Sequence, residues 1–148
     1  MIKRFLQTDN SKGTILIRLM VGAVFLSEGI QKFLFPAIRG AGRFEKIGLP
    51  LPEFLGNFVG TFEILCGILI LIGLLTRLAS IPLIMIMLVA FATTKSEVLA
   101  VKGFWEMMHG SRTDWAMLLG SIFLLIKGGG RWSIDNLVDQ SKNHNEGI

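Results

Sequence analysis

The sequence contains one cysteine and two histidines, too few for the common redox and metal sites. A single cysteine, Cys66, cannot form an internal disulfide or a CxxC redox pair. The histidines, His109 and His144, are too few and too far apart to predict a haem or zinc site. No iron–sulfur ligand spacing and no repeat of 20–50 residues is visible, and the second absence excludes a solenoid. We therefore expect no metal, haem or iron–sulfur cluster in this chain.

Charged side chains are scarce within the long apolar runs, which indicates a membrane protein. Apolar residues make up 51% of the 148 residues, and the mean hydropathy of +0.59 exceeds that of an ordinary soluble domain. The net charge of +4 comes from Lys and Arg at the chain ends and between the apolar runs. These positions suit lipid headgroups rather than nucleic acid, so we expect contact with a bilayer and no nucleic-acid partner.

Four apolar segments are long enough to be predicted as membrane-crossing helices, since a crossing needs about 20 apolar residues. The segments are about 14–35, 53–75, 78–94 and 112–127. We therefore predict an all-α integral membrane four-helix bundle over residues 14–132. It follows a polar segment at 1–13 and precedes a polar tail at 133–148, which we expect to fray. Loops are expected over 37–51 and 95–110.

Charge also predicts the orientation of the chain. Four crossings place both termini on one side, and slightly more Lys and Arg then lie on that side than on the other. The positive-inside rule therefore favours cytoplasmic termini, in a multi-pass protein of the bacterial inner membrane. Arg18, near the cytoplasmic end of the first crossing, is expected to snorkel to the headgroups.

Glu63 is the one charged group in the apolar run 58–76. At helical spacing it shares a face with Gly56, Gly60 and Gly67, which would let another helix approach closely. Because a carboxylate at membrane depth is costly, it usually marks a function. The short turn that follows this run predicts a close antiparallel hairpin between the second and third crossings.

Glu28 and Glu63 are predicted to lie at similar depth in the membrane. Glu28 lies about 12 Å from the end of the first crossing, and Glu63 about 16 Å inside the second, at 1.5 Å of rise per residue. Lys32 follows Glu28 by four residues, the favourable order for a helical ion pair. We predict that the two carboxyls share one site and one proton, with Lys32 beside Glu28. The alternative is that these groups only fasten helices together.

His109 and Asp114 lie close to the start of the fourth crossing. Because His titrates near neutrality, His109 beside Arg112 and Asp114 is a candidate for proton transfer. Asp114 also suits the first turn of a helix for structural reasons. The stretch SRTD at 111–114 resembles a capping box, with Asp where Glu or Gln is usual.

Several motifs, in this order, resemble the DoxX family of small four-helix membrane proteins. They are RLMVGAVFLSEGIQKFLFP, GRFEKIGLPLPEFLG, FEILCGILILIGLLTRLA, GFWEMMHGSRTDWAMLLGSIFLL and GGRWSID, within about 14–136. The residues that match the shared pattern are Arg18, Gly22, Gly29, Lys32, Glu63, Gly67, Arg77, His109, Asp114 and Trp115. The resemblance implies a four-helix membrane bundle in a redox setting, since relatives are described in thiosulfate:quinone oxidoreductase and in quinone or thiol stress responses.

On this resemblance we expect the membrane subunit of a quinone-associated oxidoreductase or of a redox or thiol-stress complex. The candidates for proton handling are Glu28, Glu63, His109 and Asp114. The candidates for binding a quinone are Lys32, Arg43, Gly67 and Trp115. The chain has no visible electron carrier, so a redox partner protein or a homo-oligomer is expected, and whether the chain is itself catalytic stays open. Two alternatives remain: a membrane assembly factor or scaffold, and a proton-coupled exporter of a small lipophilic compound.

Overall fold

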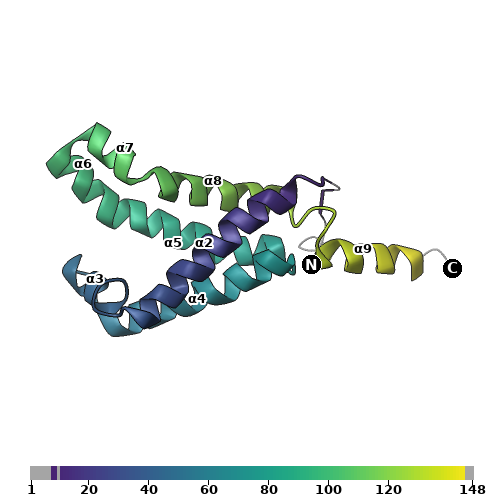
Figure 1. The fold of residues 1–148 in the computed structure, drawn as a ribbon, viewed down its shortest axis with the longest axis horizontal. Coiled ribbons are helices and arrows are strands. Elements are labelled where there is room, and N and C mark those ends of the chain that lie inside the picture. The colour runs from purple at the N-terminus through teal and green to yellow at the C-terminus, as the bar shows by residue number, and fades with distance from the viewer. Residues whose placement is uncertain (1–7, 10, 146–148) are drawn as a thin grey trace.

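The computed structural model describes residues 8–9 and 11–145, and within them all regular structure is helical (Figure 1). The elements are α2 (Thr14–Leu34), α3 (Ala41–Lys46), α4 (Pro52–Ile72), α5 (Thr76–Ala90), the π-helix η1 (Phe91–Lys95), α6 (Ser96–Lys102), α7 (Phe104–Gly110), α8 (Arg112–Lys127) and α9 (Ile134–Asn145). The chain is therefore an all-α protein, as the apolar periodicity predicts.

Three helical stretches are long and apolar enough to cross a membrane in the part of the chain that the structure describes. They are α2, α4 and the continuous helix Thr76–Lys102, which comprises α5, η1 and α6. Helix α8 has 16 residues, or about 24 Å at 1.5 Å of rise per residue, against a hydrocarbon core of about 30 Å. The protein is a membrane protein, and the fourth crossing stays a prediction.

Helix α4 illustrates how the sequence sets the ends of these helices. It begins at Pro52, whose missing N–H would have no partner at this position, with Glu53 in the first turn facing the positive end of the helix dipole. It ends at Ile72 and is capped by Gly73, where φ of +71° is the left-handed conformation that glycine adopts without strain. Leu75 also has a positive φ, of +50°, and the chain reverses there into α5.

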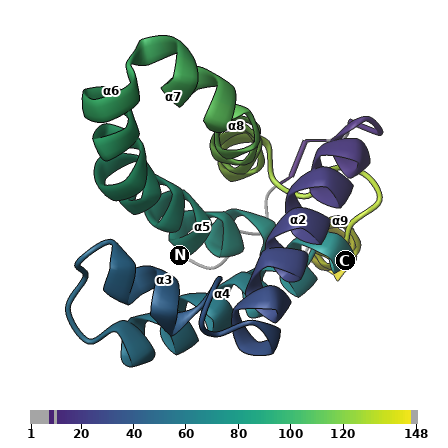
Figure 2. The same ribbon diagram turned by 60° about the vertical axis from the view of Figure 1, so that its left-hand side comes forward.

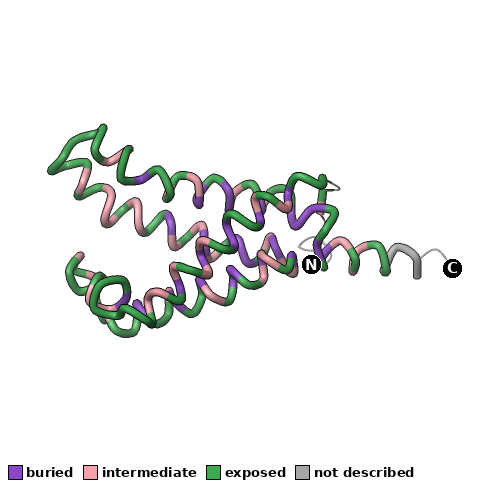
Figure 3. Tube along the Cα trace, viewed as in Figure 1, coloured by how far each residue is buried: buried purple, intermediate pink, exposed green. Residues whose placement is uncertain are grey.

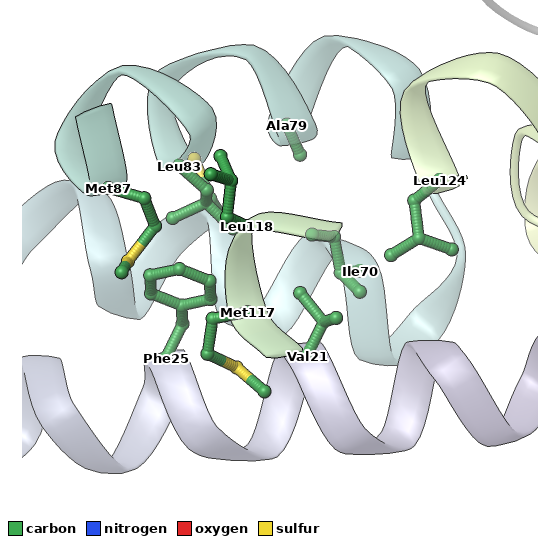
Figure 4. Packing of buried hydrophobic residues seen from close by; sticks show 10 residues of the cluster. Val21, Phe25, Ile70, Ala79, Leu83, Met87, Met117, Leu118 and Leu124 are labelled. Carbon is green, nitrogen blue, oxygen red and sulfur yellow. The ribbon is translucent and has the colours of Figure 1, made fainter. Parts of the chain in front are cut away.

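The helices form two pairs that meet at one end and diverge at the other (Figures 1 and 2). Helix α2 lies along α4, and α5 lies along α8. We call the end with α3, α6 and α7 the loop end, and the end with the start of α2 and with α9 the termini end. The pairs meet around a buried apolar cluster (Figure 4). Its members are Val21, Phe25, Cys66, Ile70, Ala79, Leu83, Met87, Met117, Leu118 and Leu124.

The outward faces of the long helices are apolar, as a bilayer requires. Exposed positions alternate with buried ones along each of them (Figure 3). Large apolar side chains such as Leu16, Leu65 and Leu119 are among those exposed. In a water-soluble protein such a surface would promote aggregation. In a membrane the same apolar side chains contact the acyl chains of the lipids.

The predicted loop over 95–110 is wrong, because this segment folds as the end of η1, then α6 and α7. The prediction relied on its charged residues, but charge marks exposure to water and does not end a helix. Gly103, with φ of +86°, makes the break between α6 and α7, and no proline interrupts the segment.

The predicted hairpin between α4 and α5 forms at the short turn that joins them, but the glycine face of α4 packs on α2. A Cβ at Gly67 would lie 2.9 Å from the backbone nitrogen of Leu26, and one at Gly29 would lie 2.8 Å from the carbonyl oxygen of Gly60. Between α4 and α5 lies instead an apolar groove of about 420 Å³. It is lined by Thr61, Phe62, Leu65, Cys66, Leu69, Leu75, Leu78, Ala79, Ile81 and Pro82.

Candidate functional site

A buried ion pair joins α2 to α4 halfway along α4. Nζ of Lys32 lies 2.6 Å from Oε2 of Glu63, and the two side chains are 12% and 5% exposed. Gly60 makes room for this approach, because a Cβ there would lie 3.3 Å from Cβ of Lys32 and 2.9 Å from the ring of Phe33. The carboxylate is thus held by a charge-assisted hydrogen bond inside the glycine seam.

Glu28 does not join this pair. Its Oε1 lies 3.9 Å from Nη1 of Arg39, and its side chain is 39% exposed. Among the described residues Lys32 makes its salt bridge with Glu63 and none with Glu28, so the predicted Glu28–Lys32 pair is wrong. The helical spacing brings Lys32 near both carboxylates, but attraction is stronger at the buried one, where water screens it less. No hydrogen bond joins the two carboxyls within this part of the chain, so the predicted shared proton has no geometric support.

Arg43 belongs to the surroundings of Glu63. It lies on α3 and is exposed, and its charge and that of Glu28 both act on the Glu63 carboxylate. Helix α3 is fixed over the loop end of α4 by Gly56, where a Cβ would lie 2.8 Å from the backbone nitrogen of Ala41. The α2–α3–α4 side therefore holds five of the candidate residues, namely Glu28, Lys32, Arg43, Glu63 and Gly67.

A second ion pair joins η1 to α8. Nζ of Lys95 lies 2.9 Å from Oδ2 of Asp114 and donates to the carbonyl oxygen of Gly110 at 3.0 Å. Beside it, the rings of Phe91 and Trp115 lie 4.7 Å apart between centroids. Phe91 and Lys95 are the two ends of η1, and π-helical turns occur frequently at functional sites. The sequence analysis did not single out either residue. Phe91 and Lys95 are four residues apart and so lie on one side of the helix, where they contact Trp115 and Asp114.

His109 lies on the exposed surface of the loop end. Nη1 of Arg112 donates to Nε2 of His109 at 2.8 Å and to its carbonyl oxygen at 3.0 Å. The predicted capping box does not form, because the Ser111 hydroxyl instead contacts Sδ of Met107 at 3.6 Å. Within the described ranges no hydrogen bond or ion pair links His109 or Asp114 to Glu63. The candidates for proton handling therefore fall into two sets, one on each helix pair.

Arg18 is buried at the termini end and does not snorkel, so that prediction is wrong. Its side chain is 3% exposed. Nε donates to the carbonyl oxygen of Ile70 at 2.9 Å, and Nη2 to that of Leu71 at 2.6 Å. Nη1 donates to the carbonyl oxygens of Gly129, at 3.2 Å, and Trp132. Two of these acceptors lie in the last turn of α4, where helix carbonyls lack a full set of helical partners, and Ile70 also accepts from the backbone N–H of Gly73 at 3.1 Å.

Asp135 complements Arg18 from the predicted polar tail. It is buried, and its two carboxylate oxygens accept hydrogen bonds from the backbone N–H groups of Leu75, at 2.7 Å, and Thr76, at 2.9 Å. The start of the 133–148 segment is therefore ordered as α9 and caps α5, contrary to the expected fraying. A base at the end of α4 and an acid at the start of α5 both suit the helix dipoles. Arg18 and Asp135 thus bind the two sides of the turn between α4 and α5.

Comparison with known proteins places the chain in a family. A model of the DoxX family matches residues 13–96, more than half of the chain. The chain belongs to the DoxX family. It is 51% identical over 138 residues to the "Uncharacterized membrane protein Rv3486" of Mycobacterium tuberculosis, covering 89% of this chain and 85% of that protein. It is 28% identical over 133 residues to the "Putative oxidoreductase CatD" of Bacillus subtilis, covering 89% and 91%. No solved structure matches the chain.

The Lys32–Glu63 site offers a hydrogen-bond donor beside an ionisable acceptor. Groups of three or more His, Cys, Asp or Glu side chains that could hold a metal ion are absent from the described residues. Lys32 offers N–H donors, and Glu63 is an acceptor that can take up a proton. Because their reacting atoms are already 2.6 Å apart, a proton can pass between them without a large movement of either helix.

Proposed function

We propose that this DoxX protein is the membrane subunit of a quinone-associated oxidoreductase system, in which Glu63 and Lys32 move a proton. The observation that carries the proposal is the buried pair of Lys32 and Glu63 halfway along a candidate membrane span. The name of the Bacillus subtilis relative, "Putative oxidoreductase CatD", supports the redox setting. The proposed site in the cell is the bacterial inner membrane, with both termini in the cytoplasm.

The energetics of the pair favour a role in proton movement. A single charge at the centre of a membrane helix costs about 2.5–3.5 kcal/mol on insertion scales. The pair avoids that cost in two ways, as ammonium with carboxylate or as amine with carboxylic acid. Both states have the same net charge, and one proton moving between Nζ and Oε2 converts one into the other. A bound molecule that hydrogen-bonds to either side chain can therefore receive one proton from the pair or release one proton to it.

The apolar groove between α4 and α5 fits the hydrocarbon part of a quinone. Its walls are apolar apart from Thr61, whose hydroxyl already donates to the carbonyl oxygen of Asn57 at 2.8 Å. Phe62 and Cys66 line it and flank Glu63 along the chain, so the groove and the ion pair occupy adjoining faces of α4. A quinone supplies the redox chemistry, since it takes up protons together with electrons. Lys32 would donate a hydrogen bond to a ring oxygen.

The electrons must come from a partner in this proposal. The chain has one cysteine, Cys66, which is free and buried, and it offers no second thiol for an internal dithiol couple. We therefore propose a redox partner protein that delivers electrons while Glu63 and Lys32 deliver the proton. Glu28, Arg39 and Arg43, which are more exposed, would connect the pair to water at the loop end.

Purification in mild detergent, with mass spectrometry of bound small molecules and proteins, tests this proposal. We expect a quinone and a redox protein to co-purify with the parent chain. Glu63→Gln keeps the shape and hydrogen bonding of the side chain but cannot ionise. Membranes that contain it should lose quinone reduction, whereas membranes with the exposed control Glu45→Gln should keep it.

Two results would overturn the redox role. Parental quinone reduction by Glu63→Gln across the pH range would end the proton-transfer argument. A stoichiometric partner without any bound quinone would favour an assembly factor or scaffold, in which Lys32 and Glu63 only fasten α2 to α4. In that case Glu63→Gln should be active and Glu63→Leu should fail to fold.

A further inference from the structure

A second, polar pocket lies at the termini end, away from the Lys32–Glu63 pair. It has a volume of about 550 Å³. Its lining residues are Thr8, Asp9, Arg77, Ile126, Lys127 and Asp139. Two bases and two acids thus face one open pocket, which is formed where α5 begins and α8 ends.

The pocket lies where the apolar helix surface gives way to water. Arg77 is the second residue of the 27-residue candidate span, and Lys127 is the last residue of α8. Ile126, beside Lys127, is 63% exposed. Helix α9, which contributes Asp139, continues beyond the ends of α5 and α8 and away from the bundle (Figure 1). A molecule in the pocket can therefore contact three levels of the protein. These are Ile126 on the lipid side, Arg77 at the membrane boundary and Asp139 on the aqueous side.

Arg77, which lines the pocket, has unused hydrogen-bonding capacity. Its Nε is buried and meets no hydrogen-bond partner among the described residues. Buried N–H groups are almost always paired in native proteins, so the structure leaves a donor for which an acceptor is expected. Guanidinium groups match the oxygen geometry of a phosphate. Lys127 adds a second positive charge, held 2.9 Å from Oδ2 of Asp9.

Asp139 gives the pocket a charge of the opposite sign. Within the described ranges its carboxylate forms no salt bridge, and it is partly buried on α9. The pocket therefore presents a donor for a phosphate near the membrane boundary and an acceptor for a cation farther into water. A phosphate alone would leave Asp139 unpaired and close to a like charge.

We propose that this pocket binds the headgroup of a zwitterionic glycerophospholipid, with its phosphate on Arg77 and Lys127 and its ammonium on Asp139. The order of charges in the pocket matches that of such a headgroup, in which the phosphate is next to the glycerol and the ammonium is outermost. The acyl chains then run along the exposed apolar surface near Ile126. This lipid site does not depend on the redox role.

The test is the unfolding midpoint of the purified full chain in detergent with added lipid. Short-chain phosphatidylethanolamine should raise Tm, and phosphatidylglycerol should raise it less. Arg77→Gln and Asp139→Asn should each abolish the difference between the two lipids. The control Lys102→Gln, an exposed base on α6 at the opposite end, should keep it. Asp139→Asn provides the answer even if Arg77→Gln fails to fold.

Two further ligands separate the headgroup from its parts. Inorganic phosphate and soluble phosphoethanolamine should stabilise less than the lipid at equal concentration, because neither contacts the apolar surface. Equal stabilisation by phosphate alone would identify a free-anion site and overturn the proposal. Equal or greater stabilisation by phosphatidylglycerol, or a lipid effect unchanged in Asp139→Asn, would overturn the zwitterionic assignment.

Discussion

Removing one member of the Lys32–Glu63 pair should destabilise the protein more than removing both. At 2.6 Å and an effective dielectric constant of about 20, the gross attraction is about 6 kcal/mol. Desolvation offsets part of it, and measured losses on breaking a buried pair are about 3–5 kcal/mol. Lys32→Met leaves the carboxylate alone in the seam, and Glu63→Leu leaves the ammonium alone. We expect each single variant to lose about 3 kcal/mol, the lower limit, because the remaining group can become neutral.

The double variant Lys32→Met/Glu63→Leu places two apolar side chains in the seam. Apolar replacement of a whole buried pair is often neutral or stabilising, so we expect its free energy of unfolding to lie within about 1 kcal/mol of the parent. Reversible unfolding in mixed micelles, analysed as a double-mutant cycle, gives the coupling energy. Glu28→Leu is the control, since its carboxylate is 39% exposed and 3.9 Å from its partner, and it should lose less than about 1 kcal/mol.

This reasoning fails if the losses of the two single variants simply add in the double variant. Additivity would mean that Lys32 and Glu63 act on stability independently, whatever their distance. It also fails if either single variant loses no more than Glu28→Leu, because the pair would then be as weakly coupled as an exposed one.

Three other perturbations test the packing and the orientation. Gly67→Leu should cost about 1–3 kcal/mol by overpacking the α2–α4 seam, while Gly110→Ala, where a Cβ meets nothing within 4 Å, should leave the unfolding midpoint unchanged; equal midpoints would show that the seam is loose. Arg18→Gln should lower the free energy of unfolding by at least about 3 kcal/mol, since glutamine has two N–H donors and loses at least two of the four bonds, each contributing about 1.5–3 kcal/mol; parental stability would show that the buried carbonyls have other donors. Trp105→Cys, in a Cys66→Ala background, should react with an impermeant thiol reagent on intact cells; reaction only after permeabilisation would reverse the proposed orientation.

The helices and their membrane setting could be predicted because apolar length is a property of the sequence itself. The second crossing was predicted over 53–75, and α4 covers Pro52–Ile72. The segment 95–110 could not be predicted in the same way, because its helices α6 and α7 are only seven residues long each and its charges suggested a loop. The sequence also could not predict which helix packs on the glycine face. Gly60 and Gly67 indicate that another helix comes close, but they do not identify it.

The site was predictable where it depends on one helix and unpredictable where it depends on two. The burial of Glu63 follows from its own glycine-rich face, and the structure bears this out. The partner of Lys32 does not follow from spacing along α2, because contact across the seam at Gly60 brings Glu63 within reach. Arg18 bonds to backbone carbonyls, which every residue has, so no sequence signal identifies its acceptors.

Redox-induced infrared difference spectroscopy of the purified protein with added quinone tests most directly whether Glu63 changes its protonation. If Glu63 and Lys32 exchange a proton, the reduced-minus-oxidised spectrum contains a carboxylic acid C=O band that shifts in D2O. That band should vanish in Glu63→Gln, change in Lys32→Met and remain in Glu28→Gln. A difference spectrum in which Glu63→Gln keeps the band unchanged would contradict the proposal that this carboxyl carries the proton.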